Sequence, residues 1–178
     1  MKMSDIEKIC WSGKFLRIIT RGRWEIAQRH NCNGIVGIIA VTNDQELILV
    51  EQYRIPVRAN VIEIPAGLSG DSDEHHEEPL RNAAERELLE ETGYTAKIWQ
   101  YITDTASSAG LTDEIISFYL AKNLTKITDG GGDSSESITV HRVKIKDLPN
   151  WLTKQQSDGK IIDAKVFASL HWINQLCP

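Results

Sequence analysis

The segment Arg86-Glu87-Leu88-Leu89-Glu90-Glu91-Thr92-Gly93-Tyr94 decides the fold of this 178-residue chain. Residues 79–92 have helical composition. They begin with Pro79, which suits the first helical position, and Gly93 follows them as a C-terminal stop. At about 100° per residue, one face of this helix is apolar. That stripe consists of Leu80, Ala83, Ala84 and Leu88. The sequence therefore predicts an amphipathic helix that packs through this stripe.

Two acidic residues fall within the apolar stripe. Glu87 and Glu91 are four residues apart, so their carboxylates lie one above the other on the packing face. Buried, unpaired like charges are costly or become protonated. A divalent cation removes both problems, and carboxylate oxygens suit Mg²⁺ or Mn²⁺. The alternative, a solvated acidic face, fits Glu90 better, because Glu90 lies off the stripe and can pair with Arg86.

The rest of the chain alternates strands with two further helices. A strand or a hairpin is predicted at 8–20, and strands are predicted at 23–29, 34–41, 46–54, 61–64, 96–103, 114–121 and 138–145. We expect strand 46–54 to form a hairpin with strand 34–41. Helices are predicted at 149–156 and 163–176, the second with Asp163 as its N-cap. Its inward-facing residues are expected to be Val166, Phe167, Leu170 and Ile173. This order predicts an α+β fold or an α/β/α sandwich.

Composition limits the classes of partner. Apolar residues make up 41% of the chain and the net charge is −5, so a nucleic-acid partner, which needs a basic surface, is not expected. No run approaches the roughly 20 apolar residues that span a bilayer, and residues 1–18 lack the apolar core of a signal peptide. Cys10, Cys32 and Cys177 are expected to be free thiols. We therefore expect a cytoplasmic protein with no membrane partner.

The helical segment also matches a known pattern. Residues 86–94 resemble the second half of the Nudix box, RE-U-x-EE-x-G-U with U apolar, and Glu78 stands eight residues before Arg86 as the box requires. Residues 63–68 (EIPAGL) resemble the segment that opens the box. There is one departure: ten residues separate Gly67 from Glu78, where the family has five. The loop 69–78 therefore looks like an insertion of five residues that leaves the helix intact.

The resemblance extends over roughly residues 20–176. Four segments outside the box are similar to sequences of the ADP-ribose and nucleoside-diphosphate-sugar pyrophosphatase branch of the Nudix hydrolases. These segments are RWE at 23–25 with Arg29, EQYR at 51–54, SAGLTDE at 108–114 and the tail at 159–173. This branch implies an α/β/α sandwich with a mixed sheet over residues 33–178. It also implies an N-terminal antiparallel strand segment, 1–32, that pairs two subunits into a homodimer.

The resemblance implies a role for particular residues. The metal ligands it implies are the Ala66 carbonyl, Glu87, Glu91 and Glu136. It implies that Glu90 supports this cluster and that Arg86 orients the glutamates. The substrate-binding residues it implies are Trp24, stacked on the nucleobase and able to come from the partner subunit, Glu25 at the base edge, Arg29 and Arg54 on phosphates, and Glu114. From the residues alone, Trp24 can instead be a core or dimer aromatic, and Arg54 a surface ion pair.

The general base is left open by the sequence. Where some relatives carry a second glutamate, this chain has Ser134, so Glu136, Asp133 and Glu114 all remain candidates. The glycines at 130–132 are expected to form a loop that can close on substrate.

The resemblance implies Mg²⁺-dependent (or Mn²⁺-dependent) hydrolysis of a nucleoside diphosphate sugar to a nucleoside monophosphate and a sugar phosphate. The alternatives are a Nudix hydrolase for dinucleoside polyphosphates, coenzyme A or oxidised nucleotides, and a non-catalytic nucleotide-sensing domain. The complete set of Glu87, Glu90 and Glu91 argues against the sensor.

Overall fold

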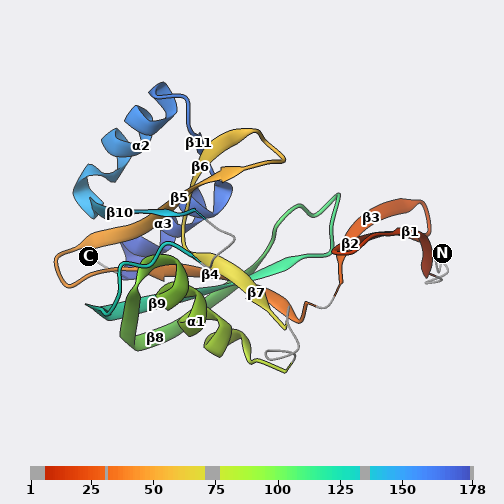
Figure 1. Ribbon diagram of the computed structural model, residues 1–178, viewed down its shortest axis with the longest axis horizontal. Coiled ribbons are helices and arrows are strands. Elements are labelled where there is room, and N and C mark those ends of the chain that lie inside the picture. The colour runs from red at the N-terminus through yellow and green to blue at the C-terminus, as the bar shows by residue number, and fades with distance from the viewer. Residues whose placement is uncertain (1–6, 31, 71–76, 133–136, 177–178) are drawn as a thin grey trace.

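The computed structural model describes residues 7–30, 32–70, 77–132 and 137–176 (Figure 1). An antiparallel N-terminal sheet has the order β1-β2-β3, formed by β1 (Glu7–Ser12), β2 (Leu16–Arg21) and β3 (Trp24–Arg29). It projects from the body of the molecule, as the red and orange strands of Figure 1 show. One contact that joins it to the body is the hydrogen bond from the Ala27 N–H to the Leu111 carbonyl, 2.8 Å long. The predicted N-terminal strand segment is thus confirmed as an antiparallel sheet.

Two four-stranded sheets form the body. The first has the order β7-β4-β9-β8 and consists of β4 (Gly34–Ala40), β7 (Ala66–Ser69), β8 (Tyr94–Ala106) and β9 (Ile115–Lys126). The second has the order β10-β5-β6-β11 and consists of β5 (Glu46–Arg54), β6 (Ala59–Glu63), β10 (Thr139–Lys144) and β11 (Ile161–Ile162). The pairs β4–β9 and β6–β11 are parallel and the other pairs are antiparallel. The prediction of mixed sheets is confirmed.

Helices cover both faces of this β layer (Figure 1). They are α1 (Leu80–Thr92), the 3₁₀ turn η2 (Ile145–Asp147), α2 (Leu148–Ser157) and α3 (Ala164–Leu176). Alternate residues of β4 show the layering, since Ile38 belongs to the cluster packed on α1 whereas Ile39 belongs to the cluster packed on α2 and α3. Both residues are fully buried, as expected for a strand covered on both sides. The α+β class and the α/β/α layering are confirmed.

Two expectations about these elements are wrong. Strands β4 and β5 do not form a hairpin within one sheet; an isolated antiparallel bridge, Val41 to Leu47, joins them at the turn. Both edges of β4 are occupied by β7 and β9, so β5 pairs in the other sheet. In α3, Phe167 is 49% exposed, because the helix turns Val166, Ser169 and Ile173 toward the core instead. The Asp163 cap is confirmed: its carboxylate accepts a hydrogen bond from the Lys165 backbone N–H at 2.7 Å.

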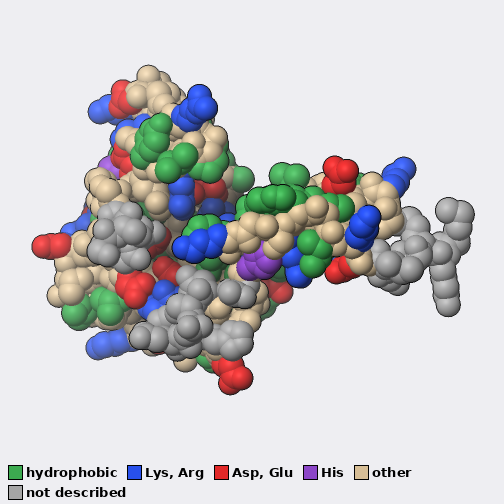
Figure 2. All heavy atoms as spheres, turned by 45° about the vertical axis from the view of Figure 1, so that its right-hand side comes forward, with side chains coloured by type: hydrophobic (Ala, Val, Ile, Leu, Met, Phe, Trp, Pro, Cys, Tyr) green, Lys and Arg blue, Asp and Glu red, His purple; other side chains and the backbone are tan. Residues whose placement is uncertain are grey.

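The N-terminal sheet carries many exposed apolar side chains. Figure 2 shows hydrophobic groups gathered along this projection. The exposed large ones are Ile9, Trp11, Phe15, Leu16 and Trp24. Cys10 is a free thiol, as expected, and the Cys32 thiol donates to the Gly34 carbonyl at 3.2 Å, whereas Cys177 lies outside the described residues. None of the helices in the described segments has the length and apolar character needed to cross a bilayer.

Candidate active site

Helix α1 carries the central carboxylates of the site. It follows Pro79 and ends at Gly93, whose φ of 76° lies in the left-handed region and whose N–H donates to the Leu89 carbonyl. Ala83, Ala84 and Leu88 are fully buried, and Glu91 is only 3% exposed on the same face. The predicted helix is therefore confirmed, with a carboxylate inside its packing face, but Pro79 is its extended N-cap and Leu80 is its first residue.

The glycine-rich loop extends the cap of this helix. The N–H groups of Gly131 and Gly132 donate to the carbonyls of Glu91 and Glu90, at 2.9 and 3.1 Å. These bonds satisfy carbonyls that have no partner within the helix. The expected loop is thus bound to the end of α1 at its first residues. Its remaining residues, 133–136, lie outside the described part of the chain, and with them Asp133, Ser134 and Glu136.

Strand β7 passes directly beside the two glutamates. The Ala66 N–H donates to the Glu91 carboxylate at 3.1 Å. At Gly67, an added Cβ would lie 1.9 Å from the Cδ of Glu87. The backbone can approach the Glu87 carboxylate this closely only because residue 67 has no side chain. The backbone of the EIPAGL segment therefore lies directly against the carboxylates of Glu87 and Glu91.

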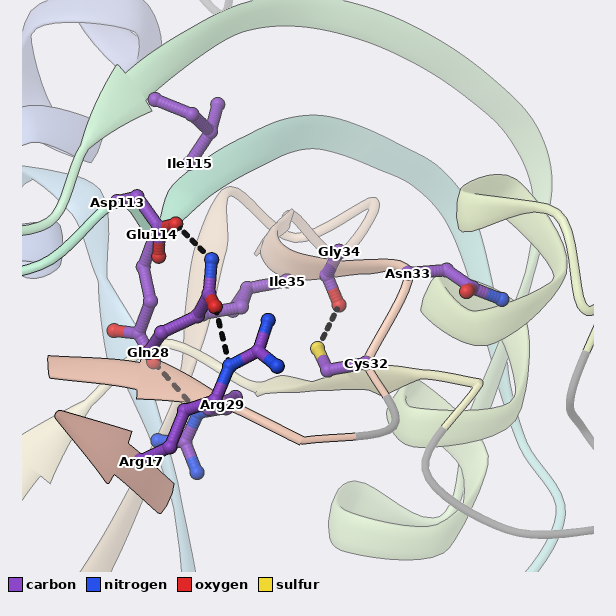
Figure 3. Close-up of a pocket in the computed structure, with 10 residues that line it drawn as sticks. All are labelled: Arg17, Gln28, Arg29, Cys32, Asn33, Gly34, Ile35, Asp113, Glu114 and Ile115. Atoms are coloured by element: carbon purple, nitrogen blue, oxygen red, sulfur yellow. Dashed lines mark hydrogen bonds and ion pairs between the residues drawn. The ribbon is translucent and has the colours of Figure 1, made fainter. Parts of the chain in front are cut away.

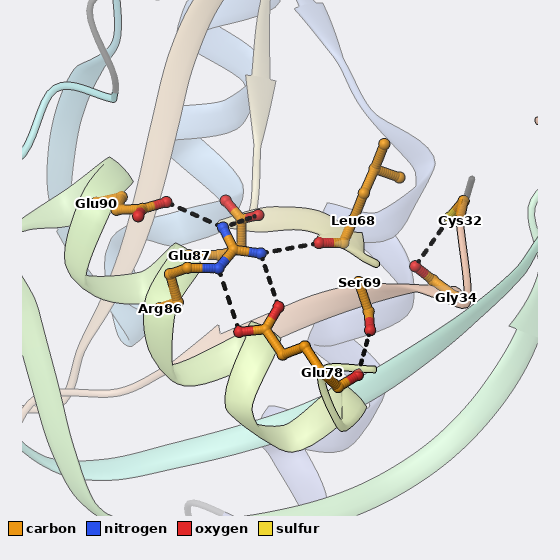
Figure 4. Close-up of polar contacts among 8 residues, drawn as sticks. All are labelled: Cys32, Gly34, Leu68, Ser69, Glu78, Arg86, Glu87 and Glu90. Carbon is orange, nitrogen blue, oxygen red and sulfur yellow. Dashed lines mark hydrogen bonds and ion pairs between the residues drawn. The ribbon is translucent and has the colours of Figure 1, made fainter. Parts of the chain in front are cut away.

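Arg86 joins three carboxylates and the backbone of β7 (Figure 4). Its hydrogen bonds run to Glu78 (3.0 and 3.3 Å), Glu87 (2.8 Å), Glu90 (3.0 Å) and the Leu68 carbonyl (2.9 Å). Burial acts to lower the pKa of its guanidinium, but Glu78 and Glu87 outweigh that effect and raise the pKa above its usual value. The permanently charged Arg86 thus fixes the Glu87 side chain in one orientation.

The inserted loop does not remove Glu78 from this network. The Ser69 hydroxyl donates to the Glu78 carbonyl at 2.6 Å, which ties the two ends of the loop together. The Asn33 N–H donates to the Ser69 carbonyl at 2.7 Å. Residues 71–76 lie outside the described part. The anchored ends explain how the box geometry is retained despite the longer loop.

One pocket of about 370 Å³ brings together six of the predicted site residues, which are Arg29, Arg54, Ala66, Glu87, Glu91 and Glu114. They come from β3, β5, β7, α1 and the segment before β9. Arg29 pairs with Glu114, its Nε lying 2.6 Å from a carboxylate oxygen. Positive and negative side chains therefore face one cavity, as the binding of a metal and phosphates together requires.

Sequence reasoning missed two charged residues here. Glu63 is 5% exposed and accepts hydrogen bonds from Arg54 at 2.5 and 3.0 Å, so Arg54 forms an ion pair, while its contact with phosphate stays a prediction. Lys165, at the start of α3, lines the same pocket and lies 3.8 Å from Glu63. Glu63 stands in the quoted EIPAGL segment and Lys165 in the quoted tail, but their proximity cannot be seen in a local pattern.

Trp24 and Glu25 are placed differently from Arg29. Both are exposed, and neither is among the described residues that line this pocket. They stand at the opposite end of β3 from Arg29, and at about 3.3 Å per residue that separates Trp24 from Arg29 by roughly 17 Å. Within one chain, Trp24 and Glu25 therefore lie outside the lining of this pocket, and their contact with a substrate stays a prediction.

The donor set fits a hard divalent cation. Glu87 and Glu91 present carboxylate oxygens from successive turns of α1, and Ala66 lines the same pocket. Oxygen ligands of this kind suit Mg²⁺ and Mn²⁺. No group of three or more His, Cys, Asp or Glu side chains among the described residues is placed to hold a metal. Glu136, the third carboxylate implied by the resemblance, falls outside them.

Comparisons with known proteins agree with this geometry. The chain is 34% identical over 141 residues to a methanol dehydrogenase activator of Bacillus methanolicus, covering 79% of this chain and 71% of the relative. It is 36% identical over 141 residues to an ADP-ribose pyrophosphatase of Bacillus subtilis, with the same shares covered. A crystal structure of an ADP compounds hydrolase superimposes with a TM-score of 0.64 at 20% identity, covering 82% of this chain and 80% of the other, which supports the fold alone. The model of the NUDIX domain matches residues 33–168, and the chain therefore belongs to the NUDIX domain family.

Proposed function

We propose that this protein hydrolyses the diphosphate bond of a nucleoside diphosphate sugar, with ADP-ribose as the favoured substrate. The proposal rests on one observation: the carboxylates of α1 line the same pocket as Arg29 and Arg54. A diphosphate requires this combination, because its charge needs both cations and positioned donors. The similarity to the ADP-ribose pyrophosphatase of Bacillus subtilis supports the choice of substrate class.

Glu87, Glu91 and the Ala66 carbonyl would hold a divalent cation, which we assign as Mg²⁺ with Mn²⁺ as the alternative. When bound, such a cation activates water and neutralises phosphate charge. Arg86 fixes Glu87, and Glu90 is held by the same guanidinium. Arg29 and Arg54 would donate charge-assisted hydrogen bonds to phosphate oxygens. We propose Glu136 as a further ligand.

We propose that one of three acidic residues acts as the general base. Glu114 lines the pocket, where its carboxylate accepts hydrogen bonds from Arg29 and the Ser107 hydroxyl. Asp133 and Glu136 are the other candidates. A base must come within hydrogen-bond reach of the attacking water, so a pH–rate profile of each Asp→Asn or Glu→Gln variant would distinguish them.

We also propose a homodimer in which the N-terminal segment 1–32 pairs two subunits and residues 33–178 form the hydrolase domain. The exposed apolar side chains of the N-terminal sheet support this arrangement. Trp24 and Glu25 would then reach the partner's substrate. A monomeric mass by light scattering at micromolar concentration would contradict it. We propose a cytoplasmic location, which the free thiol of Cys10 supports.

A panel assay tests the proposed function. The protein is incubated with Mg²⁺ and, separately, ADP-ribose, GDP-mannose, ADP-glucose, UDP-glucose, a diadenosine polyphosphate and coenzyme A, and products are separated by chromatography. We expect a nucleoside monophosphate and a sugar phosphate from a nucleotide sugar, with ADP-ribose turned over fastest. Cleavage of polyphosphates or coenzyme A alone would contradict the substrate class. Binding without turnover, with either Mg²⁺ or Mn²⁺, would favour a nucleotide sensor.

A further inference from the structure

The pockets of the described residues differ in charge. The candidate active-site pocket is lined by both arginines and glutamates. The pocket in Figure 3, about 530 Å³ in volume, is charged as well, since Arg17, Arg29, Asp113 and Glu114 line it. These two pockets share Arg29 and Glu114 and therefore belong to one charged region. A third pocket lies outside this region.

The third pocket, about 390 Å³ in volume, lies where β10 begins beside β5. The pairing of β10 with β5 starts at Thr139 and Glu51, so the last residues of β5 extend past β10. The residues that line the pocket are Glu51, Gln52, Tyr53, Ile55, Asn60, Ser137 and Thr139. In the described part of the chain, none of them lines either charged pocket. The volume is within the range of small-molecule sites, about 300–1,000 Å³.

The strand register places four of these side chains on one face of the sheet. Glu51 is paired with Thr139, and Tyr53 is paired with Asn60. Directly opposed residues of paired strands point to the same face, and so do residues two apart on one strand. Arg54, which lines the active-site pocket, alternates with Tyr53 and so points to the other face. The third pocket is therefore separated from the active site by strand β5.

Glu51 is the charged group of this pocket, and its side chain is 11% exposed. The Asn60 amide donates to one of its oxygens at 3.0 Å, and the other oxygen lies 2.7 Å from Nζ of Lys160 and 2.9 Å from Nε2 of His141. Burial acts to raise the pKa of Glu51, but the hydrogen bonds from Lys160 and His141 outweigh it and lower the pKa. The ionised carboxylate would repel a phosphate, and a cation would have to compete with Lys160 for it. The pocket therefore favours a neutral ligand.

The other lining groups suit a ring that carries hydroxyl groups. Tyr53 is 59% exposed and offers its aromatic ring, and Ile55 is 79% exposed. Asn60, Ser137 and Thr139 are exposed, and their amide and hydroxyl groups can both donate and accept hydrogen bonds. A sugar ring matches this set, because its hydroxyl groups bond to such partners and its apolar C–H face packs on an aromatic ring.

We propose that the third pocket is a binding site for a neutral sugar ring, separate from the candidate active site. The ring would stack on Tyr53, and its hydroxyl groups would donate to Glu51 and Asn60. The hydroxyls of Ser137 and Thr139 would bond to the remaining ones. A free saccharide and the ribose of a nucleoside share this chemistry. The inference goes beyond the proposed function and does not depend on it, because the described linings of the two sites have no residue in common.

Nuclear magnetic resonance of the ¹⁵N-labelled full chain tests the proposal. Ribose, glucose, mannose, adenosine and ribose 5-phosphate are titrated separately to millimolar concentrations without added metal, so that the carboxylates of α1 hold no cation during the measurement. We expect at least one neutral sugar or adenosine to shift the amide resonances of Tyr53, Asn60 and Thr139. The amides of Ala66 and Gly67, beside the α1 carboxylates, should stay unchanged.

Two variants and one control locate the ligand. Tyr53→Ala should weaken binding roughly tenfold, because it removes the stacking surface. Thr139→Val keeps a β-branched side chain but removes one hydroxyl, and it should weaken binding roughly fivefold. Tyr101→Ala on β8 is the control, since Tyr101 is 52% exposed and lies in the other four-stranded sheet. It should match the wild type, and the dispersion of each spectrum shows whether the variant is folded.

Each outcome bears on the proposal. Tighter binding of adenosine than of ribose at these residues would support it with a nucleoside as the ligand, and tighter binding of glucose or mannose would support it with a saccharide. Three results would overturn it: no shift of these amides with any neutral ligand, equal affinities of Tyr53→Ala and Tyr101→Ala, or binding of ribose 5-phosphate here as tight as that of ribose. If sugar binding is intact but no nucleotide sugar is hydrolysed in Mg²⁺, only the proposed function fails.

Discussion

Replacing Gly67 by alanine should lower the catalytic activity while leaving the stability of the fold nearly unchanged. The new Cβ would lie 1.9 Å from Cδ and 2.0 Å from Oε1 of Glu87. Ordinary contact begins at 3.4 Å, so the Glu87 carboxylate must move by about 1.5 Å. The backbone at Gly67 imposes no strain of its own, because its φ is not among the positive values. The added methyl group therefore acts through the Glu87 side chain.

A displacement of this size is large for a residue that we propose as a metal ligand, but it is small for the fold. Metal–ligand distances hold within about 0.2 Å, and a misplacement of about 1 Å in an active site costs on the order of a hundredfold in rate. Stability should change little, because the displaced group is the end of a flexible side chain and a compatible Gly→Ala change gains about 0.4–1 kcal/mol. We expect the free energy of unfolding to stay within about 2 kcal/mol of the wild type.

The assay compares kcat/KM for ADP-ribose in Mg²⁺ with the urea unfolding midpoint. Gly110→Ala serves as a control, since a Cβ at Gly110 meets nothing within 4 Å. Gly67→Ala should lose about two orders of magnitude in kcat/KM while Gly110→Ala stays near the wild type. If Gly67→Ala retains more than a third of the wild-type kcat/KM, the position of Glu87 does not matter to the reaction and the reasoning is refuted.

Three further predictions concern stability. Arg86→Met should lower the free energy of unfolding by about 3–5 kcal/mol, because it leaves buried carboxylates unpaired; a loss under about 1 kcal/mol in urea denaturation would contradict the proposed role of the guanidinium. Gly93→Ala should cost about 1–3 kcal/mol, since φ is 76° and the Cβ would lie 2.1 Å from a backbone oxygen; an unchanged thermal midpoint would count against it. Burial acts to raise the pKa of Glu51, but hydrogen bonds from Lys160 and His141 outweigh it and hold the pKa below 4.5. A depressed folded-state pKa gives stability that is present above pH 4.5 and lost as the pH falls through the folded value, so the advantage of wild type over Glu51→Gln should shrink there; a constant difference between pH 7 and pH 3 would be inconsistent with this.

Helix α1 could be predicted from the sequence because its signals are local. Pro79, Gly93 and the stripe through Leu88 all lie within or next to the helix, and the i,i+4 pair of Arg86 with Glu90 follows from helical geometry alone. The same periodicity placed Glu91 on the buried face, which the structure confirms.

Features that depend on distant pairing could not be predicted. The wrong β4–β5 hairpin followed from proximity in sequence, whereas β4 pairs in parallel with β9, for example Ile38 with Tyr119. The contact of Lys165 with Glu63 likewise joins β6 to α3 across about a hundred residues, and no local pattern contains it. Phe167 was expected to be buried because it continues the apolar stripe, whereas the buried face includes the polar Ser169, whose hydroxyl donates to the Val166 carbonyl.

Hydrolysis of ADP-ribose by two glutamine variants of one helix tests the central claim most directly. Glu91→Gln keeps an oxygen that can accept from the Ala66 N–H but removes the charge, whereas Glu85 lies on the solvent face of α1, paired with Arg81. With Mg²⁺, the wild type and Glu85→Gln should both release AMP and ribose 5-phosphate. Glu91→Gln should be slower by about a hundredfold or more, equal to about 2.7 kcal/mol of transition-state stabilisation. Equal activity of Glu91→Gln and Glu85→Gln in a folded protein would contradict the assignment of the α1 carboxylates as the reaction centre.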